Sequence, residues 1–240
     1  MRGFTALLRK ELRSSFNSPV AFIVVAGFLA LSASWTFVIN DFFAEGVASL
    51  RGYFGIMPIV FVVLVPAITM RVWAEERRAG TDEILLTLPV DEWTLVLAKY
   101  ASSLFLVLIA IGLTVFVPIS VRRLGDFERG EILGQYIGLV LLAGSGVAVG
   151  QLASSLARNQ ISAFVISALT LLAFSLVGEV GTIINLPDSL ASFLRYLSFD
   201  AHYRNFIRGI LDTRDLVFFV GLSALMLVVN TRVLVLRKFR

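Results

Sequence analysis

The chain has 240 residues, 58% of them hydrophobic and 16% charged, and its formal net charge is +4. Soluble domains are about 45–50% apolar, so this composition excludes an ordinary soluble protein and predicts an integral membrane protein. The lack of cysteine excludes disulfides, thiolate metal sites and cysteine nucleophiles, and the dispersed lysines and arginines argue against a nucleic-acid-binding surface.

Residues 3–17 are predicted to form an amphipathic helix that lies at the membrane interface. Apolar side chains recur there at helical spacing, and basic side chains fall on the opposite side. Glu11 projects among the apolar positions, where contact with water, with Arg13 or with a neighbouring loop is favoured over a specific partner. A cluster of helix breakers at residues 17–19 ends the helix. The residues assigned to this interfacial helix are Phe4, Leu8, Arg9, Lys10, Glu11 and Leu12.

Six apolar runs, each near the length of a membrane-spanning helix, follow along the chain. They predict an all-α integral membrane protein with six transmembrane helices in one domain over residues 1–240. An even number of spans places both termini on one side of the membrane. The larger share of lysine and arginine on that side predicts that it is the cytoplasm. The predicted spans cover residues 20–39, 54–70, 100–121, 132–153, 161–178 and 216–236.

Residues 70–99 form a charged segment between the second and third apolar runs. Gly80 is predicted to end an extension of the second span, and Thr81 to cap a short new helix that Pro89 ends. Acidic residues occupy the first turn of this helix, where the helix dipole favours them. A short helix anchored at both ends can transmit a rigid-body movement from a soluble partner to two spans, although an ordinary solvated loop fits the pattern equally well.

The fourth apolar run is rich in glycine and alanine. Pairs of small residues four positions apart allow helices to approach each other closely in lipid. The pattern predicts tight packing either within the subunit or across a dimer, and the general abundance of glycine in membrane helices explains it equally well. The glycines assigned to helix packing are Gly138, Gly146 and Gly150.

The segment between the fifth and sixth runs, residues 179–215, is predicted to contain two short helices. The first follows Pro187 and Asp188, and its apolar side chains recur at helical spacing up to Leu197. The second has an apolar side that is weakened by a glycine in its interior and is formed by Phe206, Ile207, Ile210 and Leu211. The two helices could lie at the outer interface, dip back between the spans or cap a central path.

The sequence carries no recognisable catalytic or nucleotide-binding motif. No phosphate-binding loop of the form GxxxxGK followed by Ser or Thr is present, so ATP is not bound by that route. The single histidine, His202, excludes a two-histidine zinc motif and is interpreted as a hydrogen-bonded or interfacial imidazole. The span centres hold no charged residue, which argues against an ion-coupled carrier. Gln151 and Asn230 are expected to bond across helices rather than to contact a substrate.

Three stretches together resemble one known family of membrane proteins. The run RVWAEERRAGTDEILLTLPV, residues 71–90, resembles the signature of ABC-2 type permeases, and within them the gliding-motility GldF-like subgroup. The stretches RKELRSSFNSP, residues 9–19, and LSFDAHYRNFIRGILDTRD, residues 197–215, agree with this resemblance. The similarity covers the whole chain.

The resemblance implies a single transmembrane permease domain with a coupling helix, residues 81–88, that docks on a separate ATP-binding cassette ATPase. It implies two permease copies, identical or closely homologous, and two ATPase subunits that bind ATP and magnesium. This chain itself would hold no cofactor or metal and would not be an enzyme. The residues assigned to ATPase coupling are Glu75, Glu76, Arg77, Gly80, Thr81, Asp82, Glu83, Ile84, Leu85, Leu88 and Pro89.

We therefore expect the transmembrane subunit of an ABC-2 transporter in the cytoplasmic (inner) membrane, in contact with lipid, with export as the expected direction. The alternative is a membrane anchor or mechanical transmitter that uses ATPase partners to act on extracytoplasmic proteins without moving a solute. The long segment 179–215 makes this alternative credible, and an additional membrane or extracytoplasmic subunit is left open as a further partner. The family does not share one cargo, so the resemblance does not identify a substrate.

Overall fold

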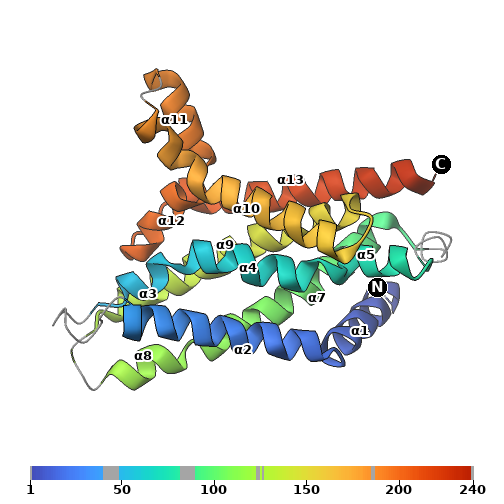
Figure 1. Ribbon diagram of the computed structural model, residues 1–240, viewed down its shortest axis with the longest axis horizontal. Helices are drawn as coiled ribbons and strands as arrows, with labels where there is room; N and C mark the ends of the chain where they lie inside the picture. The colour runs from blue at the N-terminus through green and yellow to red at the C-terminus, as the bar shows by residue number, and fades with distance from the viewer. Residues whose placement is uncertain are drawn as a thin grey trace.

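The computed structural model describes residues 2–39, 49–81, 90–122, 125, 127–184 and 187–238. Within these ranges the regular structure is helical, without a strand. Figure 1 shows the long helices running side by side, with both chain termini at the same end of the bundle. The predicted all-α fold is confirmed, because six of the described helical segments are long and apolar enough to cross a bilayer.

The described helices follow one another in chain order. Their bounds are α1 (Arg2–Phe16), α2 (Pro19–Ser34), the π-helical turn η1 (Trp35–Ile39), α3 (Arg51–Gly55), α4 (Met57–Thr69), α5 (Arg71–Arg78), α7 (Glu92–Leu113), α8 (Phe116–Val121), α9 (Arg129–Leu156), α10 (Gln160–Ile183), α11 (Asp188–Leu197), α12 (Phe199–Ile207) and α13 (Thr213–Lys238). The six candidate spans cover Pro19–Ile39, Met57–Arg78, Glu92–Val121, Arg129–Leu156, Gln160–Val180 and Thr213–Arg237.

Two ends of the bundle are distinguished by the short helices that they carry. The α5 end holds α1, α5 and the last turns of α13, and the α12 end holds α3, α8 and α12 (Figure 1). The break between α1 and α2 lies at the α5 end, where Ser18 has an extended backbone with φ −91° and ψ 121°. Pro19 then begins α2, because proline fits the first turn of a helix. Helix α1 therefore turns back across α7.

Helix α9 is the centre of the bundle, and it packs against α4, α7, α10, α12 and α13. Its glycines make these contacts close. A Cβ added to Gly138 would lie 2.6 Å from Cγ of Phe206 in α12, and one added to Gly150 would lie 3.0 Å from Cβ of Thr69 in α4. At Gly146 the added Cβ would lie 3.5 Å from a methyl group of Val65, also in α4. All three glycines thus face helices of the same chain.

The segment between α10 and α13 divides into two helices that behave differently. Helix α11 projects away from the bundle (Figure 1) and leaves Leu190, Phe193 and Tyr196 45%, 57% and 58% exposed. Helix α12 returns to α9 and buries Phe199, Tyr203 and Phe206, so this second helix is packed among the span ends.

The apolar side predicted for the second helix was wrong for two of its four residues, which lie outside the helix. Helix α12 ends at Ile207, before Ile210 and Leu211, which are 53% and 58% exposed. The chain leaves the helix at Gly209, whose φ of +74° is a left-handed conformation that favours glycine. The glycine is therefore a terminator of the helix and not a weak point inside it.

Burial is very uneven among the six candidate spans. The most apolar window of α9 is 67% buried, whereas those of the first, fifth and sixth spans are 17%, 22% and 28% buried. Lipid tails are as apolar as these side chains, so packing a side chain against another helix gives no hydrophobic gain over contact with lipid. The outer spans can therefore present apolar surface to lipid or to another membrane chain.

Candidate functional site

Helix α5 is fastened to the last turn of α9. The backbone N–H groups of Trp73 and Ala74 donate to Oγ of Ser154 at 3.1 and 3.3 Å, and that hydroxyl donates to the carbonyl of Met70 at 3.1 Å. The short break at Met70, which separates α4 from α5, is thereby held by a side chain of a different helix. This serine positions the start of α5 on α9.

Arg77 fastens the other end of α5 to the same turn. Its guanidinium donates to the carbonyl of Ser155 at 2.8 Å and also to the carbonyl of Ala157. The last carbonyls of a helix lack partners within the helix, and a cation near them also complements the helix dipole. Arg77 therefore caps α9 from the side and ties α5 to it at a second point.

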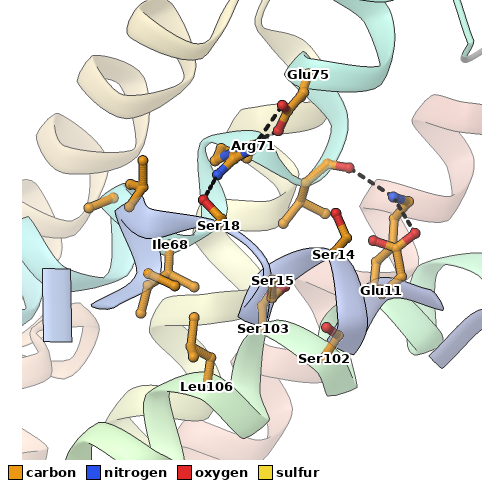
Figure 2. A pocket seen from close by; sticks show the side chains of 15 residues that line it. Glu11, Ser14, Ser15, Ser18, Ile68, Arg71, Glu75, Ser102, Ser103 and Leu106 are labelled. Atoms are coloured by element: carbon orange, nitrogen blue, oxygen red, sulfur yellow. Dashed lines mark hydrogen bonds and ion pairs between the residues drawn. The ribbon is translucent and has the colours of Figure 1, made fainter. Parts of the chain in front are cut away.

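A third connection joins α5 to the corner between α1 and α2. Arg71 and Glu75 form a two-pronged ion pair within α5, with N–O distances of 2.6 and 2.9 Å, and Arg71 also donates to the hydroxyl of Ser18 (Figure 2). A two-pronged guanidinium–carboxylate pair fixes both side chains in one geometry. The orientation of α5 relative to the α1–α2 corner is fixed in this way.

At the α5 end, the ammonium of Lys99 in α7 contacts groups from both α1 and α5. Its side chain is 1% exposed, and Nζ donates to Oε1 of Glu11 at 3.1 Å, to Oε1 of Glu76 at 2.9 Å and to the carbonyl of Val72 at 3.0 Å. These three acceptors use all three donors of the ammonium. Nζ also lies 4.9 Å from the ring centre of Trp73, within the range of a cation–π interaction.

We call Lys10, Glu11, Glu76 and Lys99 the Lys99 cluster. Lys10 lies 3.7 Å from the carboxylates of both Glu11 and Glu76, so two cations face two anions and the formal charges cancel. The cluster joins α1, α5 and α7. A buried charge that loses its partner is strongly unfavourable, so separation of these three helices is opposed electrostatically.

A small polar cavity lies beside the Lys99 cluster, between α1, α2, the α4–α5 junction and α7. Its volume is about 70 Å³, and it is lined by hydroxyls and charged groups as well as by apolar residues, among them Ile68 and Leu106 (Figure 2). This size and polarity suit a few water molecules, which bind where several polar groups converge. The serines that line it are Ser14, Ser15, Ser18, Ser102 and Ser103.

The predicted coupling residues are only partly described. Glu75, Glu76 and Arg77 lie together in α5 with the contacts given above. Gly80 follows α5 with a φ of +66°, and Thr81 is exposed, with its N–H donating to the carbonyl of Glu76 at 3.0 Å. The remaining predicted members lie outside the described residues: Asp82, Glu83, Ile84, Leu85, Leu88 and Pro89.

The predicted interfacial helix has two different sides. Phe4, Leu8 and Leu12 are half-buried, and Arg9 and Lys10 are exposed. Glu11 differs from the expectation, because it pairs with Lys99 rather than with water, Arg13 or a loop. The reason is that α1 packs along α7, which brings together two residues 88 positions apart in the sequence.

Lys99 itself was missed as a site residue. The sequence placed it just before a third span that begins at residue 100, as a charge facing the cytoplasm. Helix α7 begins at Glu92, so Lys99 lies two turns inside the helix, where it faces α1 and α5. The acidic residues at 91 and 92 indicate this helix start in the sequence, but no local signal indicates that α1 and α5 would surround Lys99.

Three other polar residues singled out in the sequence have defined surroundings. His202 bonds through Nδ1 to Asp215 at 2.6 Å and through Nε2 to the carbonyl of Tyr196 at 2.8 Å, as a satisfied imidazole should. Gln151 donates across helices to the carbonyl of Val96 at 3.0 Å. The amide of Asn230 is buried and has no hydrogen-bond partner among the described residues, contrary to the bond predicted for it.

Comparison with known proteins gives two findings. Residues 29–236 match the family described as "ABC-2 family transporter protein". The chain is 30% identical over 183 residues to the "Probable multidrug ABC transporter permease YbhS" of Escherichia coli strain K12, and equally to the protein of that name from Escherichia coli O157:H7. The alignment covers 75% of this chain and 46% of each relative, so the chain spans about half the length of these curated relatives.

Proposed function

The chain belongs to the ABC-2 family of transporter permeases, and from this membership we propose that it is the membrane-spanning subunit of an ATP-binding cassette transporter. A separate ATPase subunit docks on residues 81–89, between α5 and α7, and residues 81–88 act as the coupling helix. The ATPase binds ATP and magnesium, and the permease rearranges its spans in response. ATP can drive this change only if the docking contact differs between the two states of the permease.

The Lys99 cluster is the observation that carries this proposal. A force on residues 81–89 acts directly on α5 and on α7, because these helices precede and follow the segment. The bonds of Ser154 and Arg77 pass it to α9, and the ion pairs of Lys99 pass it to α1 and α7. Helices joined by desolvated ion pairs move as one body, as rigid-body coupling to a soluble motor requires.

We propose that the α5 end faces the cytoplasm and that the chain lies in the cytoplasmic (inner) membrane with both termini on that side. The basic residues of α1, α5 and the end of α13 support this orientation, because lysine and arginine are enriched on the cytoplasmic side of membrane proteins. Two permease copies, identical or closely homologous, form the transport path. The low burial of the first, fifth and sixth spans leaves apolar surface for a second copy as well as for lipid.

Export is the proposed direction of transport. The similar Escherichia coli proteins carry the name of a multidrug transporter permease, which supports an exporter, although the alignment covers 46% of their length. Within the family we propose the gliding-motility GldF-like subgroup, on the resemblance of residues 71–90. The cargo is not part of the proposal.

A second candidate function follows from α11. This helix projects from the bundle and exposes Leu190, Phe193 and Tyr196 on a short segment, which is a surface suited to another protein. The chain would then act as a membrane anchor or mechanical transmitter that uses ATPase partners to move an extracytoplasmic protein, without carrying a solute.

The docking proposal is tested by purifying the complex and measuring its ATPase activity. We expect the parent chain to co-purify with a polypeptide that carries a phosphate-binding loop. Glu83→Arg and Leu85→Arg, made separately, should weaken this association or the permease-dependent ATPase activity. Glu128→Arg is the matched control, since Glu128 is exposed at the α12 end and undergoes the same change of charge.

The outcome that refutes docking on residues 81–89 is full assembly and full ATPase activity in both coupling-segment variants, with helical content equal to that of the parent. The two candidate functions are separated by what the complex holds. A solute trapped between two permease copies supports transport. A protein held at α11 and released by Phe193→Asp, with no trapped solute, supports the anchor instead.

A further inference from the structure

Two exposed arginines lie close together on α1 at the α5 end. Arg9 and Arg13 are exposed, and neither guanidinium bonds to another side chain within the described part of the chain. Arg71, Arg77 and Lys99 all have partners there. Like charges four residues apart on a helix repel each other, so an anion between Arg9 and Arg13 would be favourable.

A shallow apolar groove runs directly beside these two arginines. It is lined by Leu8, Leu12 and Phe16, the last 38% exposed, together with Thr5 and the stems of the two arginines. We call these six residues the α1 groove. Helix α1 lies on the outside of the bundle (Figure 1), so the groove faces the surroundings and not the protein core.

Two other charged residues of the same helix, Lys10 and Glu11, already have partners within the protein. Glu11 pairs with Lys99, and Lys10 lies near Glu11 and Glu76, so these charges are balanced within the protein. Arg9 and Arg13 therefore carry positive charge on α1 that no described side chain compensates. It lies at the end of the spans, where the depth in a bilayer is that of the lipid headgroups.

We propose that the α1 groove binds one anionic phospholipid. The phosphate lies between the guanidinium groups of Arg9 and Arg13, because arginine matches phosphate oxygens with two parallel hydrogen bonds. An acyl chain of the lipid covers Leu8, Leu12 and Phe16. An anionic headgroup is favoured over a zwitterionic one, since the choline or ethanolamine cation would face two arginines. This site goes beyond the proposed function and does not depend on an ATPase or a cargo.

The test uses the full-length chain, purified in mild detergent with any subunits that stay bound. Native mass spectrometry measures retained lipid after incubation with equal amounts of phosphatidylglycerol and phosphatidylcholine of the same acyl chains. Each basic side chain near an anionic headgroup raises the affinity for that lipid about fivefold. Two such side chains should therefore give a preference of about 30-fold for phosphatidylglycerol over phosphatidylcholine. Arg9→Gln and Arg13→Gln should each remove about fivefold, and the double variant the whole preference.

Two further variants make the result specific to the α1 groove. Arg158→Gln combined with Arg232→Gln removes the same charge from exposed residues near the same end and should leave the preference unchanged. The double variant Arg9→Lys, Arg13→Lys keeps both positive charges and should retain part of the preference for phosphatidylglycerol. This variant is used for the test if the double glutamine variant does not fold. The headgroup alone, glycerophosphoglycerol, should not displace the lipid.

Three results would overturn the proposal. The first is equal retention of the two lipids by the parent chain. The second is an equal loss in the Arg158 and Arg232 control, which would mean diffuse surface charge. The third is displacement of the lipid by glycerophosphoglycerol at the same concentration, which would mean a phosphate site without an acyl-chain site.

Discussion

Replacement of Lys99 by methionine is the sharpest test of the Lys99 cluster. Methionine fills a similar volume without charge, so the substitution removes the ammonium and leaves little empty space. Glu11 and Glu76 then lose the buried cation between them and keep only the exposed ammonium of Lys10, 3.7 Å from each. We expect a large loss of stability, because the exposed Lys10 is a weak replacement for the buried ammonium between two largely desolvated carboxylates.

The size of the effect follows from the geometry. The two carboxylate oxygens lie 3.1 and 2.9 Å from Nζ, so they are at most about 6 Å apart. At an effective dielectric constant of about 20, two unit charges at that separation repel each other by about 3 kcal/mol. Removal of one partner from a buried ion pair costs about 3–5 kcal/mol in other proteins. We therefore expect Lys99→Met to lower the free energy of unfolding by about 3–5 kcal/mol.

The assay is reversible unfolding of the purified chain in mixed micelles, followed by circular dichroism as the denaturing detergent is increased. Lys10→Met is the matched control, because the side chain of Lys10 is 57% exposed and its ion pairs should contribute less than about 1 kcal/mol. The triple variant Glu11→Gln, Glu76→Gln, Lys99→Met removes all three charges and should recover most of the loss. Equal effects of Lys99→Met and Lys10→Met, or no recovery in the triple variant, would refute the reasoning.

Two further predictions concern the packing of α12. Gly138→Ala should destabilise the protein by about 1–3 kcal/mol, because the added Cβ would lie 2.6 Å from Cγ of Phe206. Gly112→Ala is the control: no atom of another helix lies within 4 Å of its added Cβ, so it should be neutral or stabilising in the same unfolding assay. A loss at Gly112 as large as at Gly138 would contradict this. Asp215→Ala should lower the free energy of unfolding by about 1–3 kcal/mol, since it removes the carboxylate that bonds to both His202 and Asn205. Asp188 is exposed, so Asp188→Ala should change this free energy by less than about 0.5 kcal/mol. Indistinguishable unfolding curves for the two aspartate variants would show that the buried bonds do not stabilise α12.

The number and type of the spans were predictable from the sequence, because they depend on local properties. A run of about 20 apolar residues must satisfy its own backbone hydrogen bonds in lipid, and a helix does this within the run. The amphipathic pattern of α1 and the breaker at residues 17–19 are equally local, and the structure places α1 and the turn into α2 there. The grouping of Glu75, Glu76 and Arg77 in one charged helix also follows from the order of the residues.

The partners of these charges were decided only by the tertiary structure. Lys99 is drawn out of solvent because α1 folds back over α7 and brings Glu11 to it, and α5 supplies Glu76 from another direction. Gly138 matters because α12 returns to α9 and places Phe206 on it, a contact that spacing within either helix does not encode. The sequence by itself specified which segments are helices. The packing of those helices selected which charges are buried together, because the free energy of a charge depends on neighbours that are distant along the chain.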